Sequence, residues 1–427
     1  MDVVAVYLIG DLEAEGRDVF MRIPEGAESR QGHIEHVWRI VKSLYGLKQS
    51  ARLWNKRLMK FWLEQGYKPM LADGSIMMKL DESGFIMVSI YVDDLLIAAT
   101  SMELVKEVKA ALCKEFKMQD LGEARMIIGM RIIRHRAKRL LTLDQTSYIK
   151  DVLQDEGLLV CNPVTIPMKP GSYIALDDKG DDEQAPIIPY QRLIGKLLYI
   201  ACGTRPDIAF AVGCLSQQCS DPRVGHNKAA KGVLRYLKAT MNLGIHYNGA
   251  YATTEALLTT LGYADSNYAG DIVERKSTMG YCFFLVRGVV SWCSKKQRTV
   301  STSTTEAEYI AVGHAARQAV WLRRFLAELP IDQPITPVRI LGDNQSSLAI
   351  VKNAEYHDRT KHIDVQHHYV RELVQDGYVC MEWITTKEQL ADGFTKALPK
   401  ATFVEQRTKL SIMPVILDQL ALKSGGN

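Results

Sequence analysis

The sequence has no Cys-x-x-Cys pair, although eight cysteines are spread along its 427 residues. The spacing typical of a zinc site or a disulfide framework is therefore missing, and reduced thiols in an intracellular compartment are the simplest interpretation. It also lacks any run near the roughly 18 apolar residues that cross a bilayer, so we expect no membrane partner. The N-terminus shows no signal-peptide pattern.

The sequence also lacks a large excess of positive over negative charge. Fifty-three Lys and Arg stand against 49 Asp and Glu, which gives a formal net charge of only +4. That surplus does not by itself indicate a nucleic-acid partner, so local clusters must decide. The hydrophobic fraction of 47% is that of a globular protein, and the length allows two or three domains.

The run from Tyr91 to Asp94 contains two adjacent acids, Asp93 and Asp94. Apolar runs flank them, Phe85 to Ile90 and Leu95 to Ala99, which predicts a strand, a tight turn and a strand. Carboxylates held at such a turn are costly unless a cation lies on them, and Mg²⁺ or Mn²⁺ prefers oxygen ligands. An ordinary hairpin with acids in its turn is the alternative for this run alone.

Two further runs flank this hairpin in the first third of the chain. Met1 to Ile9 is apolar apart from Asp2, which predicts a buried strand with one carboxylate at its start. The run Ser43 to Ser50 (SLYGLKQS) precedes a helical pattern, and Gly46 indicates a close backbone approach there. An amphipathic helix is predicted from Met102 to Phe116.

In order and spacing, these runs resemble the reverse transcriptase of copia-type LTR retrotransposon polyproteins. The resemblance implies a palm in which Asp2, Asp93 and Asp94 hold two divalent ions for nucleotidyl transfer. It implies that an aromatic residue and the SLYGLKQS run lie at the incoming nucleotide. The residues expected there are Tyr7, Tyr45, Gly46 and Lys48.

The resemblance also sets expectations about partners. Because the chain begins one residue before the first acid, we expect the family's fingers region to be absent and this chain alone not to polymerise DNA. Primer–template, deoxynucleoside triphosphates and the upstream polyprotein segments, the fingers and the integrase, are the implied partners. The implied location is a cytoplasmic virus-like particle, with the nucleus as the alternative.

Two basic clusters follow the palm motifs. The first lies in a turn that resembles the family's primer-contacting hairpin, and a solvated hairpin tip is an equal alternative. The second is a helical stripe with an apolar opposite face, which suits a docked helix facing nucleic acid; a solvated helix face is the alternative. The first includes Arg131 and Arg134; the second is Lys228, Lys231, Arg235 and Lys238, opposite Ala230, Val233, Leu234 and Leu237.

From Leu257 onward the predicted order is three strands, a helix, a strand, helices, a strand and a helix, with acids at four places. This order and the runs GYAD, STTEAEY, DNQS and QLAD resemble the RNase H domain of the same family. The resemblance implies a second two-metal site that cuts RNA in RNA/DNA hybrids. The four acids are Asp265, Glu308, Asp343 and Asp392, and the implied hybrid contacts are Lys361 and His362.

Two glutamates compete for the helical position in that site. Glu306 completes a capping box with Ser303, which gives it a structural task at the start of the helix. Glu308 precedes Tyr309-Ile310-Ala311, the pattern that follows the catalytic glutamate of RNases H. We therefore assign the site to Glu308 and keep Glu306 as the alternative.

The expected fold is α+β / α/β, a reverse-transcriptase palm and thumb without fingers, followed by an RNase H-like domain. Two non-enzymatic alternatives remain, an inactive nucleic-acid-binding remnant and an adaptor; clustered carboxylates count against both, because binding does not need them. The expected parts are a palm at 1–118, a thumb-like hairpin and helix at 119–160, a linker and connection at 161–255, the RNase H-like domain at 256–410 and a tail at 411–427.

Overall fold

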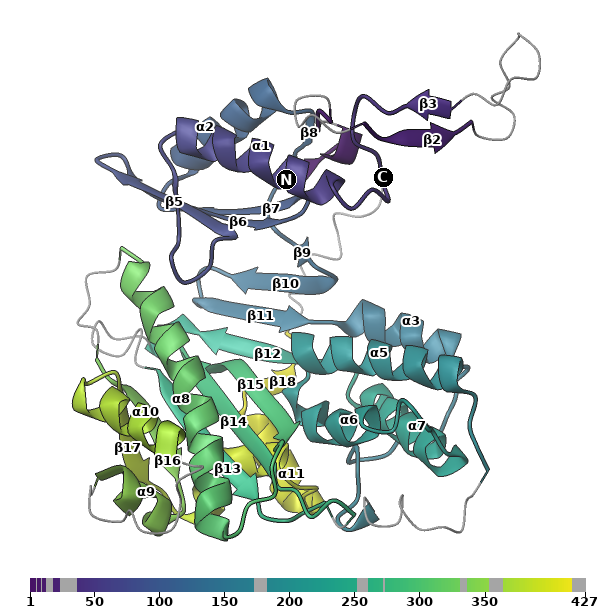
Figure 1. Cartoon of the computed structure of the whole chain (residues 1–427), viewed down its shortest axis with the longest axis vertical. Coiled ribbons are helices and arrows are strands. Elements are labelled where there is room, and N and C mark those ends of the chain that lie inside the picture. The colour runs from purple at the N-terminus through teal and green to yellow at the C-terminus, as the bar shows by residue number, and fades with distance from the viewer. Residues whose placement is uncertain are drawn as a thin grey trace. The chain divides into compact units, whose positions relative to one another are not determined.

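Figure 1 shows the computed structural model of the chain, which divides into two compact units. Unit 1 is Met1–Ala124 with Glu328–Pro330, and unit 2 is Arg125–Ala327 with Ile331–Asn427. No described helix is long and apolar enough to cross a membrane. The structure describes residues 1–4, 6–8, 10–12, 18–23, 37–172, 183–251, 260–271, 273–330, 336–352 and 364–416.

Unit 1 is built on a six-stranded sheet with the order β4-β5-β6-β7-β1-β8. Two helices cover one face of it (Figure 1), and the side chains between them form the core of the unit. The sheet strands are β1 (Asp2–Val3), β4 (Lys68–Pro69), β5 (Ile76–Asp81), β6 (Gly84–Tyr91), β7 (Asp94–Ala99) and β8 (Met118–Gln119). The other elements are η1 (Val6–Leu8), β2 (Phe20–Arg22), β3 (Val37–Arg39), α1 (Ser50–Glu64) and α2 (Met102–Glu115).

Local sequence explains the helices and the hairpin of unit 1. The predicted helix after the hairpin is confirmed as α2, which Ser101 caps by accepting a hydrogen bond from the amide of Leu104. Its buried residues Leu104, Val108 and Leu112 recur every fourth position and so face the sheet together. The predicted hairpin is confirmed by the antiparallel pair β6 and β7, whose last register pair joins Tyr91 to Asp94.

The predicted strand from Met1 to Ile9 is wrong at residues 6–8, while Ala5 and Ile9 lie outside the described residues. The strand β1 has only two residues, because it pairs with a single residue of β7 and with the two-residue strand β8. A 3-10 turn follows, in which Val6 is buried and Leu8 is exposed. A short apolar run therefore marked buried backbone correctly, but it did not distinguish a strand from a turn.

Unit 2 contains two five-stranded sheets. The first has the order β18-β12-β11-β10-β9 and is antiparallel throughout, so residues near position 413 pair with a strand near position 244. A group of helices packs beside it in a separate apolar cluster. The strands are β9 (Met126–Ile127), β10 (Met130–His135), β11 (Leu140–Asp144), β12 (Leu243–Asn248) and β18 (Ile412–Pro414). The helices are α3 (Thr146–Asp155), α5 (Ile187–Gly203), η3 (Pro206–Ile208), α6 (Ala209–Ser216), α7 (Val224–Ala239) and η4 (Gly249–Tyr251).

The second sheet has the order β15-β14-β13-β16-β17. The strand β14 is antiparallel to both of its neighbours, β15 and β13, whereas β13, β16 and β17 run parallel to one another. The long helix α8 lies across one face of it (Figure 1), and η6 contributes to the apolar core on the other face. The strands are β13 (Leu261–Asn267), β14 (Thr278–Leu285), β15 (Gly288–Lys296), β16 (Val338–Gly342) and β17 (Val379–Trp383). The helices are α8 (Thr304–Glu328), α9 (Gln345–Lys352), α10 (Asp364–Gln375), η5 (Thr386–Glu388), η6 (Leu390–Phe394) and α11 (Lys400–Lys409).

This sheet confirms the predicted order of three strands, a helix, a strand, helices and a strand. The final element differs, since the QLAD run opens the 3-10 helix η6 and the α-helix begins only at Lys400. The side chain of Gln389 accepts a hydrogen bond from the amide of Ala391, and the amide of Thr395 bonds to the carbonyl of Asp392. This three-residue bonding tightens the turn before α11.

A buried ion pair joins the helices of unit 2. The Arg205 guanidinium is fully buried and donates to both carboxylate oxygens of Asp207, at 2.9 and 2.7 Å. It also donates to the carbonyl of Thr240, while Asp207 accepts from the hydroxyl of Tyr236. Arg407 of α11 donates to that same hydroxyl at 3.1 Å.

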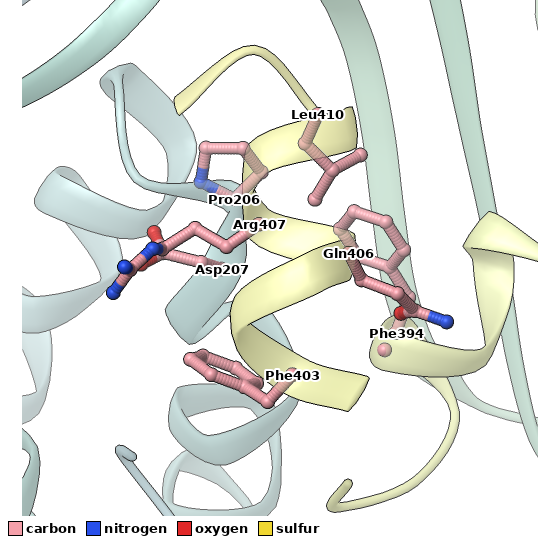
Figure 2. A pocket seen from close by; sticks show the side chains of 8 residues that line it. Pro206, Asp207, Phe394, Phe403, Gln406, Arg407 and Leu410 are labelled. Carbon is pink, nitrogen blue, oxygen red and sulfur yellow. The ribbon is translucent and has the colours of Figure 1, made fainter. Parts of the chain in front are cut away.

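The pocket in Figure 2 lies beside this network. Side chains of η3, η6 and α11 meet in it, so the network and the pocket connect α11 to the segment that carries Asp392. Its lining consists of Pro206, Asp207, Gly393, Phe394, Phe403, Gln406, Arg407 and Leu410.

Replacing Asp207 with Asn should destabilise unit 2 by about 3–5 kcal/mol, because it leaves the buried guanidinium of Arg205 without its counter-charge. Urea unfolding measures the loss. The matched control is Asp155→Asn, since Asp155 pairs with Lys196 at 3.0 Å but is 62% exposed. That change should cost less than about 1 kcal/mol. Equal losses in the two variants would contradict a stabilising role for the buried pair.

Candidate active site

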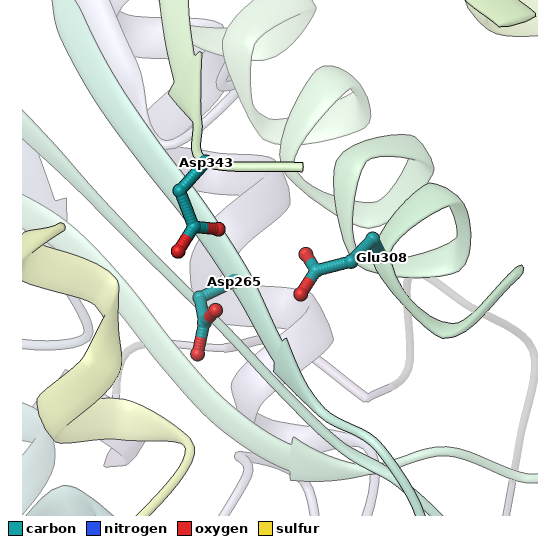
Figure 3. Close-up of side chains that lie close together, drawn as sticks. All are labelled: Asp265, Glu308 and Asp343. Atoms are coloured by element: carbon teal, nitrogen blue, oxygen red, sulfur yellow. The ribbon is translucent and has the colours of Figure 1, made fainter. Parts of the chain in front are cut away.

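Three carboxylates meet in unit 2 (Figure 3). Asp265, Glu308 and Asp343 each offer an oxygen, and these oxygens all lie within 4.8 Å of one another. The register explains why two of them meet: Tyr263 of β13 pairs with Leu341 of the parallel strand β16, and each acid lies two residues further on. Glu308 projects from α8 and points toward the two aspartates from the opposite side (Figure 3).

The fourth predicted acid, Asp392, lies on η6 and is 7% exposed. It is close enough to Asp265 to raise the pKa of that carboxyl, but it is not one of the three clustered ligands. Its Oδ1 instead forms an ion pair with Nζ of Lys396 at 2.9 Å. The structure thus brings three of the four predicted acids together and holds the fourth beside them with a lysine.

Hydrogen bonds fix these carboxylates. The buried hydroxyl of Thr395 donates to Oδ2 of Asp265, and the hydroxyl of Thr386 donates to Oδ2 of Asp343 at 2.8 Å. Sequence reasoning missed Thr386, Thr395 and Lys396. The signal was the run Thr395-Lys396 three and four residues after an acid, a spacing that returns to the same face of a helical turn.

A second set of hydrogen bonds fixes η6 against the sheet. The fully buried Gln389 donates through Nε2 to the carbonyl of Ala264, the neighbour of Asp265, at 2.9 Å. The carbonyl of Gln389 in turn accepts from Nε2 of Gln406 on α11. These two glutamines position the segment that carries Asp392.

Burial and mutual repulsion make the cluster favour protonation or a cation. Burial, followed by the charges of Asp265 and Asp343, raises the pKa of Glu308 to about 9. Burial and then the charge of Asp392 raise the pKa of Asp265 to about 7, and burial raises that of Asp392. A divalent cation would relieve the repulsion directly. Because every donor is a carboxylate oxygen, the set fits a hard ion rather than zinc.

The structure places Glu308, and not Glu306, in the cluster. The carboxylate of Glu306 accepts hydrogen bonds from the amide and the hydroxyl of Thr302, at 2.7 and 2.6 Å. The amide of Glu306 donates to the hydroxyl of Ser303. Glu306 therefore has a capping task at the start of α8, as the capping-box interpretation supposes, although its carboxylate bonds Thr302 rather than Ser303.

The three predicted acids of unit 1 lie along one edge of its hairpin. Asp2 pairs in register with Asp94, and Asp93 occupies the turn between the two strands. Two backbone bonds hold β1 there, from the amide of Val3 to the carbonyl of Asp93 and from the amide of Leu95 to the carbonyl of Met1. Burial, then the charges of Asp93 and Asp2, raise the pKa of Asp94. Within the described ranges, the three-ligand group that is close enough for a metal is the one in unit 2.

The backbone of the hairpin turn is strained, and a hydrogen bond from α1 fixes it. Val92 has φ 58°, a left-handed conformation that is unfavourable for a β-branched residue. Its carbonyl accepts a hydrogen bond of 2.7 Å from the indole of Trp54, which is buried on α1. Strain of this kind persists only where the surrounding structure fixes the backbone, and it concentrates at functional sites.

The four residues expected at the nucleotide also lie in unit 1. The rings of Tyr7 and Tyr45 meet edge to face with centroids 5.0 Å apart, and Lys48 is exposed. Gly46 has φ +91°, and a Cβ there would meet nothing within 4 Å. The close-approach interpretation is therefore wrong within the described part of the chain; the positive φ, not crowding, explains the glycine.

Several predicted nucleic-acid contacts are engaged within the chain. Arg131 donates twice to Asp144, whose side chain is fully buried, whereas Arg134 is exposed. On α7 the predicted apolar face is confirmed as buried. On its basic face, Arg235 and Lys238 donate to the carbonyls of Asn162 and Cys161. Lys228 and Lys231 are exposed, and Lys361 and His362 lie outside the described residues.

The strand order of the second sheet of unit 2, its parallel and antiparallel registers, and the acids on β13, α8 and after β16 define an RNase H-like fold. Unit 1 adds a sheet with an acidic hairpin. The class is therefore a two-part protein, an acidic hairpin sheet followed by an RNase H-like domain.

Comparison with known proteins narrows this class. The reverse transcriptase (RNA-dependent DNA polymerase) family matches residues 1–170. The chain is 39% identical over 94% of its length to the retrovirus-related Pol polyprotein from transposon TNT 1-94 of Nicotiana tabacum, covering 30% of that relative. It is 34% identical over 97% of its length to the Pol polyprotein from transposon RE1 of Arabidopsis thaliana, covering 27% of it.

The chain belongs to the family of Pol polyproteins from copia-type retrotransposons. It spans less than a third of the length of these two relatives. Among solved structures it is similar to the foamy viral protease-reverse transcriptase in complex with dsDNA, with 12% identity, a TM-score of 0.46 and coverage of 82% of this chain and 61% of that chain. The fold assignment rests on the strand order and registers and not on that likeness.

Replacing Glu308 with Gln should reduce the pH sensitivity of the metal-free protein. The folded pKa of about 9 exceeds the ordinary 4.5, so the folded state keeps a proton that the unfolded state releases. The free energy of unfolding therefore falls as pH rises through that window. In the variant this fall should be smaller by at least about 1.4 kcal/mol, the equivalent of one pKa unit. Urea unfolding with a chelator at about pH 5, 7 and 9 measures it.

Glu306→Gln is the matched control for this experiment. It weakens the cap at Thr302 and should lower stability by about 1 kcal/mol at every pH. An unchanged pH dependence in Glu308→Gln, or a reduced one in Glu306→Gln, would mean that the cluster is assigned to the wrong glutamate.

Proposed function

We propose that unit 2 hydrolyses RNA in RNA/DNA hybrids. The observation that carries this proposal is the convergence of one oxygen each from Asp265, Glu308 and Asp343 within 4.8 Å on an RNase H-like sheet. A binding protein has no need of such a cluster, because buried like charges cost folding free energy. This counts against an inactive remnant or an adaptor.

The cofactor that fits the oxygen donors is Mg²⁺ or Mn²⁺, two ions in each active site. When bound, such ions supply an activated water and stabilise the oxygen that leaves phosphorus. The chain's own task is to hold the ligands in fixed directions. Thr395 orients Asp265, Thr386 orients Asp343, and the rigid start of α8 presents Glu308 from the opposite side.

Asp392 is the fourth acid that we assign to this site. It lies beside Asp265 on the turn that the glutamines of η6 and α11 position. Its exposed fraction of 7% resembles those of Asp265 and Glu308, at 4% and 9%. Asp265, Glu308 and Asp392 are thus buried and Asp343 is half-buried, and a cation interacts with carboxylates more strongly in such a region than in water.

A second candidate function is RNA-directed DNA synthesis by unit 1. The register pair of Asp2 with Asp94, beside Asp93 in a strained turn, favours it, and residues 1–170 match the reverse transcriptase family. Carboxylates on two neighbouring strands can hold two Mg²⁺ ions, the arrangement that nucleotidyl transfer needs. Tyr7, Tyr45, Gly46 and Lys48 are the proposed nucleotide contacts.

Primer–template and hybrid duplexes are the proposed partners, with deoxynucleoside triphosphates as substrates of unit 1. Among the basic residues, Arg134, Lys228 and Lys231 are the better candidates for phosphate contacts, since they are exposed. By family, the proposed setting is a cytoplasmic virus-like particle with further polyprotein segments. We assign the palm to 1–118, the thumb-like part to 119–160, the connection to 161–255, the RNase H-like domain to 256–410 and a tail to 411–427.

With Mg²⁺ present, the wild type should cleave the RNA strand of a labelled RNA/DNA hybrid, and Asp343→Asn should lower the rate by at least about a hundredfold. The lost carboxylate is one of the three clustered ligands. Gel electrophoresis of the products measures the rate. Asp376→Asn, at an exposed position after α10, is the matched control and should cleave normally. Equal activity in the wild type and Asp343→Asn, or none in either, refutes the nuclease proposal.

Primer extension on an RNA template tests unit 1. Extension should require Asp94, because Asp94→Asn removes the carboxylate that faces Asp2, and the rate should fall by at least about a hundredfold. The assay compares the wild type with Asp94→Asn under the same conditions. Extension by Asp94→Asn at the wild-type rate would refute a metal-binding role for Asp94.

A further inference from the structure

Lys396 places a cation inside the acidic region of unit 2. Its Nζ lies 2.9 Å from Oδ1 of Asp392, and its side chain is 41% exposed. The ammonium therefore pairs with Asp392, on a turn whose Thr395 hydroxyl also bonds Asp265.

The backbone holds this lysine close to its acid. The carbonyl of Asp392 accepts hydrogen bonds from the amides of Thr395 and Lys396 and from the hydroxyl of Thr395. Thr395 is fully buried and also bonded to Asp265, which anchors the turn on the sheet. The lysine can therefore leave Asp392 only by rotation of its own side chain, and not by movement of the turn.

Electrostatics favours the charged lysine in this place. Nζ of Lys396 lies 2.9 Å from Oδ1 of Asp392, and the side chain of that acid is only 10% exposed, so a positive group beside it offsets the cost of burying its charge. The ammonium thus supplies part of the positive charge that a metal ion would supply. Asp392 cannot give the same oxygen to a metal ion and to the lysine at once.

We propose that Lys396 is a tethered counter-ion that competes with a divalent cation for Asp392. Without metal, it neutralises part of the acid cluster and stabilises the fold. A divalent cation that takes Oδ1 of Asp392 must first displace the ammonium, so Lys396 weakens metal binding at that oxygen. This inference rests on the proposed two-metal function of the site.

A merely structural ion pair would behave differently. Lys409 and Glu405 on α11 form a pair with the same spacing of four residues and the same 2.9 Å distance. That pair is exposed, at 43% and 64%, and Glu405 is not among the clustered acids. Removing Lys409 therefore tests the loss of a lysine ion pair without a change of charge at the site.

The test measures Mg²⁺ binding by isothermal titration calorimetry on the full chain. Lys396→Met keeps the apolar stem and removes the charge, so the Mg²⁺ dissociation constant should fall roughly tenfold. Lys396→Arg keeps a cation and should bind Mg²⁺ as the wild type does. Lys409→Met is the matched control and should leave Mg²⁺ binding unchanged.

Thermal unfolding with a chelator gives a second readout. Lys396→Met should unfold at a lower temperature than the wild type without metal, and Mg²⁺ should raise its midpoint more than that of the wild type. If Lys396→Met does not fold, Lys396→Gln takes its place in both measurements.

The outcomes separate this inference from the proposed function. Tighter Mg²⁺ binding by Lys396→Met supports the competition, whether or not the wild type binds measurably. Equal or weaker binding by that variant, with a wild type that binds, overturns the competition and leaves the nuclease proposal standing. If neither protein binds Mg²⁺, the proposed metal site fails and the inference fails with it.

Discussion

Repulsion among buried carboxylates is the constraint on which unit 2 depends. Asp265, Glu308 and Asp343 come from three separate elements, and two of them have pKa values raised by burial and by their neighbours. Packing elsewhere must keep these groups together against their repulsion. The parallel register of β13 with β16 and the long helix α8 across the sheet provide that framework.

The surroundings of the cluster show how the fold limits this cost. Hydroxyl groups donate to two of the acids, and Lys396 pairs with Asp392. Gln389 connects η6 to β13 through the carbonyl of Ala264, and Arg407 connects α11 to the buried Arg205 network. In unit 1 a single side chain fixes the backbone beside the acids. Trp54 donates a hydrogen bond to the carbonyl of Val92, in the strained turn next to Asp93. In both units, neighbouring acids lie on backbone that other contacts fix.

Much of this could be predicted where the information is local. The hairpin from Phe85 to Ala99, the helix α2 and the order along the chain of the strands and helices after Thr260 follow from periodicity and turn residues. The strand predicted at residues 6–8 was wrong, because short apolar runs suit several buried conformations. A helix does begin after Gln389, but it is a 3-10 helix. Within the basic clusters, the sequence did not reveal that Arg131, Arg235 and Lys238 have partners inside the chain.

The sequence by itself determined the residue types, their order and the family, because a run such as Tyr91 to Asp94 is a local pattern. Only the tertiary structure decided which carboxylate oxygens lie within 4.8 Å of one another, and that Thr395 bonds Asp265 across 130 residues of chain. It also decided that a lysine occupies one side of the acidic region. The physical reason is that strand register and helix packing set distances between elements, and the period of a single strand or helix carries no information about them.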